Sequence, residues 1–437
     1  MRNEYYLTIS PELSFHFFGD QSIIIDSDGI EYLYDSTQTS ILSLCDGTKT
    51  IKKLLETLAF QYNVDNDTKE KFNKAIVAFL DIQIKKNVVV EQNTYKMNSN
   101  IYGEKGKYYP NALSVEITNR CNFLCPHCYK NALAKGQDID ENIINYIKSE
   151  FGGKVKQLQL TGGEPFLNKK IASYISDLSE LFEIRIPTNG SLLYTFNDEI
   201  IRKINFVQFS LYGTTPEEYK EFTGSKDAYY AVMKSIEKVK NCGVDNIASL
   251  VLNKDNINRM EEYIEGAIQL GATKIKFGVP TLAGRAFDDV TQNNRFMLTH
   301  EDLRAAYRNS RELKRKYHGK ISVGIWSHRS QEPKKPLING EEYNNMLPCG
   351  AGYMSYVISQ SGRLRPCELL SEAYFDLGSY KKLSDYVKGE FFTDYSGMIG
   401  KLHSHMCKYG VGLECFCSPI ATFYERIKHS ENKEFHQ

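Results

Sequence analysis

Three cysteines stand close together in the segment CNFLCPHC, which begins at Cys121. Cys121, Cys125 and Cys128 are separated by three and then two residues, so one short loop can bring all three thiolates to a single metal centre. Iron–sulfur cubanes are usually held by four cysteines, so three thiolates would leave one iron open to a substrate or cofactor. A zinc site completed by His127 or by a distant residue is the alternative that the spacing leaves open.

Five further cysteines lie within 69 residues near the end of the 437-residue chain. They are Cys349, Cys367, Cys407, Cys415 and Cys417. Five thiolates cannot fully ligate two four-iron clusters, so we expect one additional iron–sulfur cluster, and a zinc site that holds the tail is the alternative. Cys45 and Cys242 lie in helical contexts, where a free cysteine usually acts as a small hydrophobe, and no role is assigned to them.

The elements that must position these groups alternate between strands and helices from residue 112 onward. Six apolar strand runs follow one another: ALSVEIT, VKQLQLT, EIRIPT, NFVQFSLYG, DNIASLVLN and TKIKFGVP. With helical segments between them, they predict an α/β fold with a parallel sheet, either doubly wound or curled into a partial (β/α)6 TIM-like barrel. Both architectures gather chemistry at the carboxyl ends of the strands, and the three-cysteine segment directly follows the first strand.

The chain divides into three units. Residues 1–95 contain short β-prone runs followed by helical patterns, with Thr48 as a candidate helix cap, and predict a winged-helix-like domain. The polar residues 96–111 predict a linker, residues 112–330 the barrel, and residues 331–437 a small C-terminal cysteine-rich cluster domain.

Composition excludes several classes of partner. The chain has 54 basic and 54 acidic residues and an isoelectric point near 7.1, which gives no electrostatic case for nucleic acid or for an anionic membrane surface. No apolar run approaches the roughly 18 residues of a spanning helix, and the N-terminal residues lack a signal-peptide pattern. We therefore expect a cytoplasmic protein without nucleic-acid or membrane partners, whose clustered cysteines are reduced and available to metals.

The three-cysteine segment matches the motif CxxxCxΦC, and through it the chain resembles the radical S-adenosylmethionine (SAM) enzymes. Φ is usually aromatic in this family and is His127 here. The resemblance implies a 4Fe–4S cluster on Cys121, Cys125 and Cys128, with the amino and carboxylate groups of SAM on the open iron.

A second motif of the same family follows the second predicted strand. In TGGEP, the resemblance implies that Gly162 and Gly163 let the backbone approach the cofactor and that Glu164 accepts hydrogen bonds from its ammonium group. It also makes Asn189, in PTNG, and Ser210, in FSLYG, candidates for ribose or carboxylate contacts, although Asn189 and the next glycine equally fit a simple turn. The resemblance further suggests Arg285 as a partner of the cofactor carboxylate, with an ordinary surface arginine as the alternative.

The C-terminal cysteines resemble those of the auxiliary-cluster extensions called SPASM and twitch domains. Cys349, twelve residues, a glycine, four residues and Cys367 match the opening of that pattern, whereas the later cysteines depart from it. This shortened arrangement resembles the thioether-forming maturases of peptides such as the sporulation killing factor. It implies one auxiliary cluster, 2Fe–2S or 4Fe–4S, on Cys367 and on the three later cysteines: Cys407, Cys415 and Cys417. Cys349 stays either a fifth candidate ligand or a buried packing residue.

The same resemblance implies a function. Residues 1–95 resemble the leader-recognition domain of peptide maturases, in which an exposed sheet edge can accept a peptide as an added strand. We therefore expect a ribosomally synthesised precursor peptide as substrate, a thioether crosslink formed through a 5′-deoxyadenosyl radical as the reaction, and flavodoxin or ferredoxin as electron donor. Epimerisation or carbon–carbon crosslinking of a peptide are alternatives within the family, and a zinc-binding interaction protein is the alternative outside it. No catalytic side chain beyond the cofactor-binding set is assigned.

Overall fold

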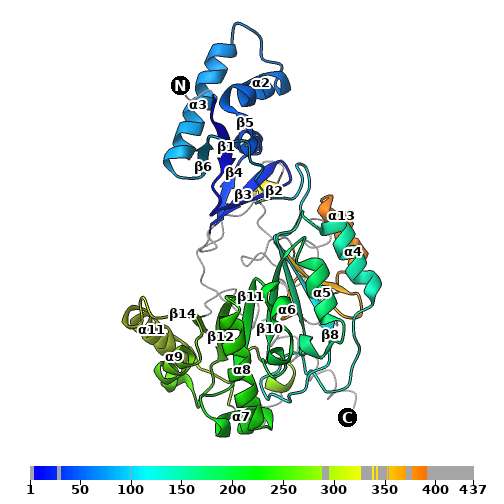
Figure 1. Cartoon of the computed structure of the whole chain (residues 1–437), viewed down its shortest axis with the longest axis vertical. Coiled ribbons are helices and arrows are strands. Elements are labelled where there is room, and N and C mark those ends of the chain that lie inside the picture. Colours follow the sequence, from blue (N-terminus) through cyan, green and yellow to red (C-terminus); the bar gives the residue numbers. More distant parts are fainter. Residues whose placement is uncertain are drawn as a thin grey trace.

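The computed structural model describes most of the chain (Figure 1). The described residues are 4–26, 31–98, 100–287, 295–325, 337–338, 341–342, 352, 354–370 and 376–390. Of the eight predicted metal ligands, four lie outside the described residues: Cys349, Cys407, Cys415 and Cys417.

In its described residues, the N-terminal domain combines two small sheets with three helices and forms a lobe beside the larger sheet (Figure 1). A three-stranded sheet has the order β5-β1-β6, and a four-stranded sheet has the order β4-β3-β2-β7. The strands are β1 (Tyr6–Ile9), β2 (Ser14–Phe18), β3 (Gln21–Ile25), β4 (Glu31–Tyr34), β5 (Asp46–Thr50), β6 (Val89–Gln92) and β7 (Ile101–Tyr102). The helices are α1 (Ser36–Leu42), α2 (Ile51–Gln61) and α3 (Lys69–Lys85).

One local prediction in this domain was wrong. Thr50 rather than Thr48 caps α2, because its hydroxyl accepts from the backbone N–H of Lys53, whereas Thr48 lies in β5 and binds the carboxylate of Asp46. Part of the predicted linker is also ordered: β7 pairs in parallel with β2.

The six predicted strands form the centre of a nine-stranded sheet. They are β8 (Ala112–Thr118), β9 (Gln157–Gly162), β10 (Glu183–Thr188), β11 (Phe206–Leu211), β12 (Asp245–Val251) and β13 (Lys274–Gly278). Neighbours pair in parallel and in sequence order from β8 to β13, with no reversal of the order. A doubly wound sheet would reverse its order part-way, so the partial barrel is confirmed.

Helices connect consecutive strands and cover the outer face of the sheet (Figure 1). They are α4 (Glu141–Phe151), α5 (Ile171–Leu178), α6 (Asp198–Arg202), α7 (Pro216–Thr223), α8 (Asp227–Asn241) and α9 (Met260–Gln269), followed by α11 (His300–Lys316). Ile143, Ile144 and Ile147 on α4 are typical of these helices, because their helical spacing puts them on one buried face. Within the part of the chain that the structure describes, no helix is long and apolar enough to cross a membrane.

Both ends of the sheet gain further strands. β14 (Ser322–Ile325) pairs in parallel with β13, and β17 (Ser355–Ile358) pairs in parallel with β8. The antiparallel partner of β17 is β18 (Leu364–Arg365), and the short helix α13 (Leu383–Val387) follows. The described residues 354–365 of the C-terminal unit therefore continue the barrel sheet. A separate pair, β15 (Leu337–Ile338) and β16 (Glu341–Glu342), forms a two-stranded sheet.

Candidate active site

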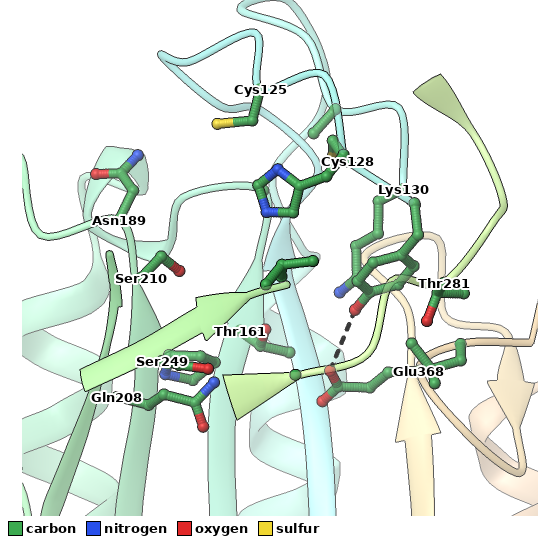
Figure 2. Close-up of a pocket in the computed structure, with 18 of the residues that line it drawn as sticks. Cys125, Cys128, Lys130, Thr161, Asn189, Gln208, Ser210, Ser249, Thr281 and Glu368 are labelled. Carbon is green, nitrogen blue, oxygen red and sulfur yellow. Dashed lines mark hydrogen bonds between the residues drawn. The ribbon is translucent and has the colours of Figure 1, made fainter. Parts of the chain in front are cut away.

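A cavity of about 780 Å³ lies at the carboxyl ends of the barrel strands. Side chains from seven neighbouring strands, β17 and β8 to β13, line it, so the sheet curls around the cavity. Cys125 and Cys128 lie at one end and Gln208 and Ser249 at the other, with Glu368 at the side (Figure 2). The cavity is therefore where the fold predicts chemistry.

The three cysteines of the CNFLCPHC segment all line this cavity, in the loop that follows β8. Cys125 is buried and Cys121 and Cys128 are partly exposed. Burial is the main cause that raises the pKa of Cys121 to about 11 and that of Cys125 to about 12. In the metal-free chain both thiols are protonated, so binding a metal there must release protons.

The donor set fits a cubane cluster better than a single ion. Among the residues described, no three Cys, His, Asp or Glu side chains are grouped so that they could hold one metal ion. In a cubane each cysteine thiolate binds a different iron atom, so the three cysteine sulfurs do not have to surround a single metal position. His127, the proposed fourth zinc ligand, is turned toward aromatic rings: its ring centroid lies 5.0 Å from that of Phe222 and 5.9 Å from that of Tyr212.

Gly162 and Gly163 let β9 pass directly beside the start of the cysteine loop. A Cβ atom would lie 2.0 Å from the carbonyl oxygen of Thr118 at Gly162, whose φ is +150°, and 2.1 Å from that of Arg120 at Gly163. The N–H of Gly163 donates to the Thr118 carbonyl at 2.9 Å. The sequence predicted that these glycines let the backbone approach a cofactor, and in the structure they let β9 approach the backbone of Thr118 and Arg120. Both glycines also line the cavity.

Glu164 is fully buried and forms hydrogen bonds that hold the loop after β10 in place. Its carboxylate accepts from the backbone N–H of Asn189 at 2.7 Å, from the Thr188 hydroxyl at 2.8 Å and from the Phe166 N–H at 3.1 Å. Burial raises its pKa to about 7, although these hydrogen bonds act in the opposite direction. Its contact with a cofactor ammonium stays a prediction.

Asn189 and Ser210 both line the cavity, at the ends of β10 and β11. The Asn189 amide donates to Asn122 Oδ1 at 2.8 Å and lies 3.9 Å from Cys121 Sγ, so it fixes the cysteine loop. The turn alternative also holds, since Gly190 has a φ of +74°. Cofactor contacts by these two residues stay predictions.

Arg285 holds the far side of the cysteine loop. Its Nε donates to the Cys125 carbonyl at 2.9 Å, and its Nη1 donates to the Ala132 carbonyl at 2.9 Å and to Asn131 Oδ1 at 3.0 Å. Three directed bonds exclude the simple surface role. Arg285 lines the cavity, and its pairing with a carboxylate stays a prediction.

Sequence reasoning missed Tyr212, which lines the cavity together with Cys125 and Ser210. Tyr212 is partly buried and packs in an aromatic group with Phe123, His127, Tyr219 and Phe222. Burial lowers the pKa of His127 to about 4, with the charges of two arginines adding to the effect, so this ring is neutral. Nothing in the spacing of the FSLYG segment distinguishes this tyrosine from a core residue.

A charged group beside the cavity was also missed. Glu116 and Arg365 are 7% and 6% exposed, and Lys130 lines the cavity next to them. Burial acts to raise the pKa of Glu116, but the charges of Lys130 and Arg365 hold it below its usual value. Burial likewise acts to lower the pKa of Lys130, but the charge of Glu116 outweighs it and the pKa is raised. These groups are far apart in sequence, so no motif could reveal them.

Cys367 lines the same cavity as the first three cysteines. It is partly exposed, and the next residue, Glu368, also faces the cavity. This is the part of the predicted auxiliary site that can be described, so that cluster stays a prediction.

Comparison with known proteins gives the family. Residues 115–267 match the family model of the radical SAM superfamily. A probable GTP 3′,8-cyclase of Archaeoglobus fulgidus is 30% identical over 222 residues, which cover 47% of this chain and 74% of that protein. The chain belongs to the radical SAM superfamily. Membership implies a 4Fe–4S cluster and SAM as cofactors, and it makes this protein an enzyme.

Other relatives of this radical SAM enzyme differ in what their names describe. The sporulation killing factor maturation protein SkfB of Bacillus subtilis is 22% identical over 303 residues, covering 65% of this chain and 68% of SkfB. The structure of Streptococcus suis SuiB bound to SAM superposes with a TM-score of 0.59 at 17% identity, covering 89% of this chain and 90% of that one. That likeness concerns the fold, and it extends over nearly the whole chain.

Proposed function

We propose that this radical SAM enzyme modifies a ribosomally synthesised precursor peptide by forming a thioether between a cysteine sulfur and a carbon atom. The observation that carries the proposal is the cavity that Cys121, Cys125, Cys128 and Cys367 line together. A peptide in this cavity would lie between the three-cysteine loop and the proposed auxiliary site. SkfB, whose name describes the maturation of a peptide factor, supports the substrate class.

The proposed ligands of the 4Fe–4S cluster are the three cysteines of the loop, with Asn189 and Arg285 holding that loop in place. Bound there in its reduced form, the cluster would supply the one electron with which SAM yields methionine and a 5′-deoxyadenosyl radical, which can remove a hydrogen atom from carbon. Tyr212 and the aromatic side chains packed on it keep water away from one side of the loop.

Thioether formation sets a further requirement. When a peptide thiol bonds to a carbon-centred radical, one proton and one electron must leave. Cys367 supports a nearby electron acceptor, because it faces the same cavity as the proposed substrate. We propose that Cys367, together with Cys407, Cys415 and Cys417, holds the auxiliary cluster, with Cys349 as a further candidate.

The N-terminal domain offers a sheet edge for the leader of the peptide. β4 is an end strand of its four-stranded sheet, and α3 lies beside it, since the Tyr34 hydroxyl donates to Gln83 Oε1 at 3.1 Å. Tyr32 on β4 and Ile82 on α3 are 46% and 49% exposed. An extended leader could pair with β4 while its side chains contact these two residues. A flavodoxin or ferredoxin would supply the reducing electron.

The proposal is tested with a small peptide encoded beside this enzyme. The anaerobically reconstituted enzyme, SAM and a reductant are incubated with the peptide, and mass and alkylation by iodoacetamide are measured. A thioether predicts the loss of two hydrogens and of one alkylatable thiol, with no change for Cys125→Ser. An unchanged mass with deuterium uptake from D2O would instead indicate epimerisation, and loss of two hydrogens with all thiols intact would indicate a carbon–carbon bond.

A further inference from the structure

The carboxylate of Glu116 joins two segments of the active site that are far apart in the sequence. Glu116 lies on β8, and its Oε1 atom is 2.9 Å from Lys130 Nζ and 2.5 Å from Arg365 Nη2. Lys130 stands two residues after Cys128, and Arg365 stands two residues before Cys367. One buried oxygen therefore holds a cation from the three-cysteine loop and a cation from the turn of Cys367.

The guanidinium of Arg365 also fixes that turn directly. Its Nη1 donates to the Leu370 carbonyl at 2.9 Å, and the Leu370 N–H donates to the Cys367 carbonyl at 3.3 Å. Arg365 thus connects Glu116 on the barrel sheet to Leu370, whose N–H closes the turn that begins with Cys367.

A second bridge joins the same two segments. The Tyr129 hydroxyl donates to Glu368 Oε2 at 3.4 Å, and the amide of Gln159 on β9 donates to Glu368 Oε1. Tyr129 and Lys130 are adjacent on one side, and Arg365 and Glu368 are close in sequence on the other. Buried polar networks of this kind constrain geometry strongly, because a broken bond leaves an uncompensated charge in a low-dielectric site.

We infer that Glu116 is a positioning residue that holds the three-cysteine loop and the Cys367 turn at a fixed spacing across the cavity. This inference rests on the proposed function, in which a peptide reacts between these two segments. If Glu116 only stabilised the fold as a whole, a change in the Cys367 turn would have no specific effect on the three-cysteine loop. A positioning role predicts that a change on the Cys367 side alters the three-cysteine loop.

The test compares Arg365→Met with Arg363→Met in the full-length, anaerobically reconstituted enzyme. Arg363 stands two residues earlier and pairs with Asp376. The Arg363→Met variant therefore loses an arginine–carboxylate pair but leaves the contacts of Glu116 intact. Iron content, SAM affinity and hydrogen exchange of residues 121–131 are measured. For Arg365→Met we expect SAM to bind roughly fivefold or more weakly, with faster exchange in 121–131, and for Arg365→Lys we expect partial rescue. Arg363→Met should match the wild type.

Glu116→Asp is the second variant, because it keeps the charge while a carboxylate one methylene shorter cannot span both cations. It should speed exchange in both residues 121–131 and residues 366–370. The inference is overturned if Arg365→Met behaves like Arg363→Met, or if Glu116→Asp changes only one segment. These measurements need no peptide, so their failure is distinguishable from a failure of the proposed thioether reaction.

Discussion

At the scale of single residues, Glu164 links the cofactor site to the stability of the fold. Its pKa is raised to about 7 in the folded chain from an ordinary value of 4.5, mainly because the carboxyl is fully buried. The folded chain therefore binds a proton more tightly than the unfolded chain does. The resulting stability is complete below about pH 4.5 and is lost as the pH rises to about 7.

The predicted contribution is roughly 3 kcal/mol at most. Thermal unfolding of the metal-free chain between pH 5 and pH 8 measures it. Relative to Glu164→Gln, which cannot ionise, wild type should lose stability as the pH rises over this range. The buried His16 and His127, whose pKa values burial lowers, act in the opposite direction but affect both proteins equally. Glu199→Gln is the control, since Glu199 is an exposed carboxylate in the first turn of α6. Equal slopes for wild type and Glu164→Gln would contradict the assignment.

The glycine pair gives a second prediction at this scale. An alanine at Gly163 would press its Cβ against the Arg120 carbonyl, so the strand or the cysteine loop must shift. Overpacking of this kind costs about 1–3 kcal/mol, and we expect SAM to bind roughly tenfold more weakly. Equilibrium binding to the reconstituted enzyme measures this. Gly324→Ala on β14, where the nearest atom lies 4.0 Å away, should leave affinity unchanged; equal losses in the two variants would contradict a specific role.

At the scale of elements, the exposed edge of β4 carries a prediction about the leader peptide. Replacing Tyr32 and Ile82 together by aspartate should weaken peptide binding about tenfold or more, because both apolar contacts become charged. Fluorescence anisotropy of a labelled precursor peptide measures this. Phe60→Asp is the matched control, because Phe60 is 85% exposed but lies on α2. A loss of affinity in Phe60→Asp alone would refute the β4 edge as the binding surface.

Elements also show how far the sequence could predict this structure. The strands Ala112–Thr118 and Glu183–Thr188 have the predicted bounds, because apolar residues that alternate with polar ones and end at a turn signal are a local feature. β7 and β17 were missed, since a short strand depends on its partner. The partner of β17 is β8, more than 200 residues earlier in the chain.

The candidate site was predictable to the same extent. Motif spacing indicated the three cysteines and the glycine pair, and all five residues line one cavity. The contacts of Arg285 with the loop backbone and the bridges made by Glu116 were not predictable. They arise where the ends of different strands meet, and no local pattern encodes such a meeting.

At the scale of the whole molecule, the three units share surfaces. Phe18 and Ile23 of the N-terminal domain pack into the hydrophobic core of the barrel, and the Tyr108 N–H donates to the Val387 carbonyl at 2.8 Å. On the other side, β17 and β18 extend the barrel sheet. A peptide held at the N-terminal domain would therefore be recognised by a unit that packs directly against the barrel.

The central claim is that a 5′-deoxyadenosyl radical formed in this cavity removes a hydrogen atom from a carbon of a peptide. The most direct measurement uses the precursor peptide produced with deuterium on its carbon atoms, incubated with enzyme, SAM and reductant. Mass spectrometry of the released 5′-deoxyadenosine should show one deuterium per molecule, and Cys125→Ser should release none of the nucleoside. Unlabelled 5′-deoxyadenosine formed together with a modified peptide would contradict the account.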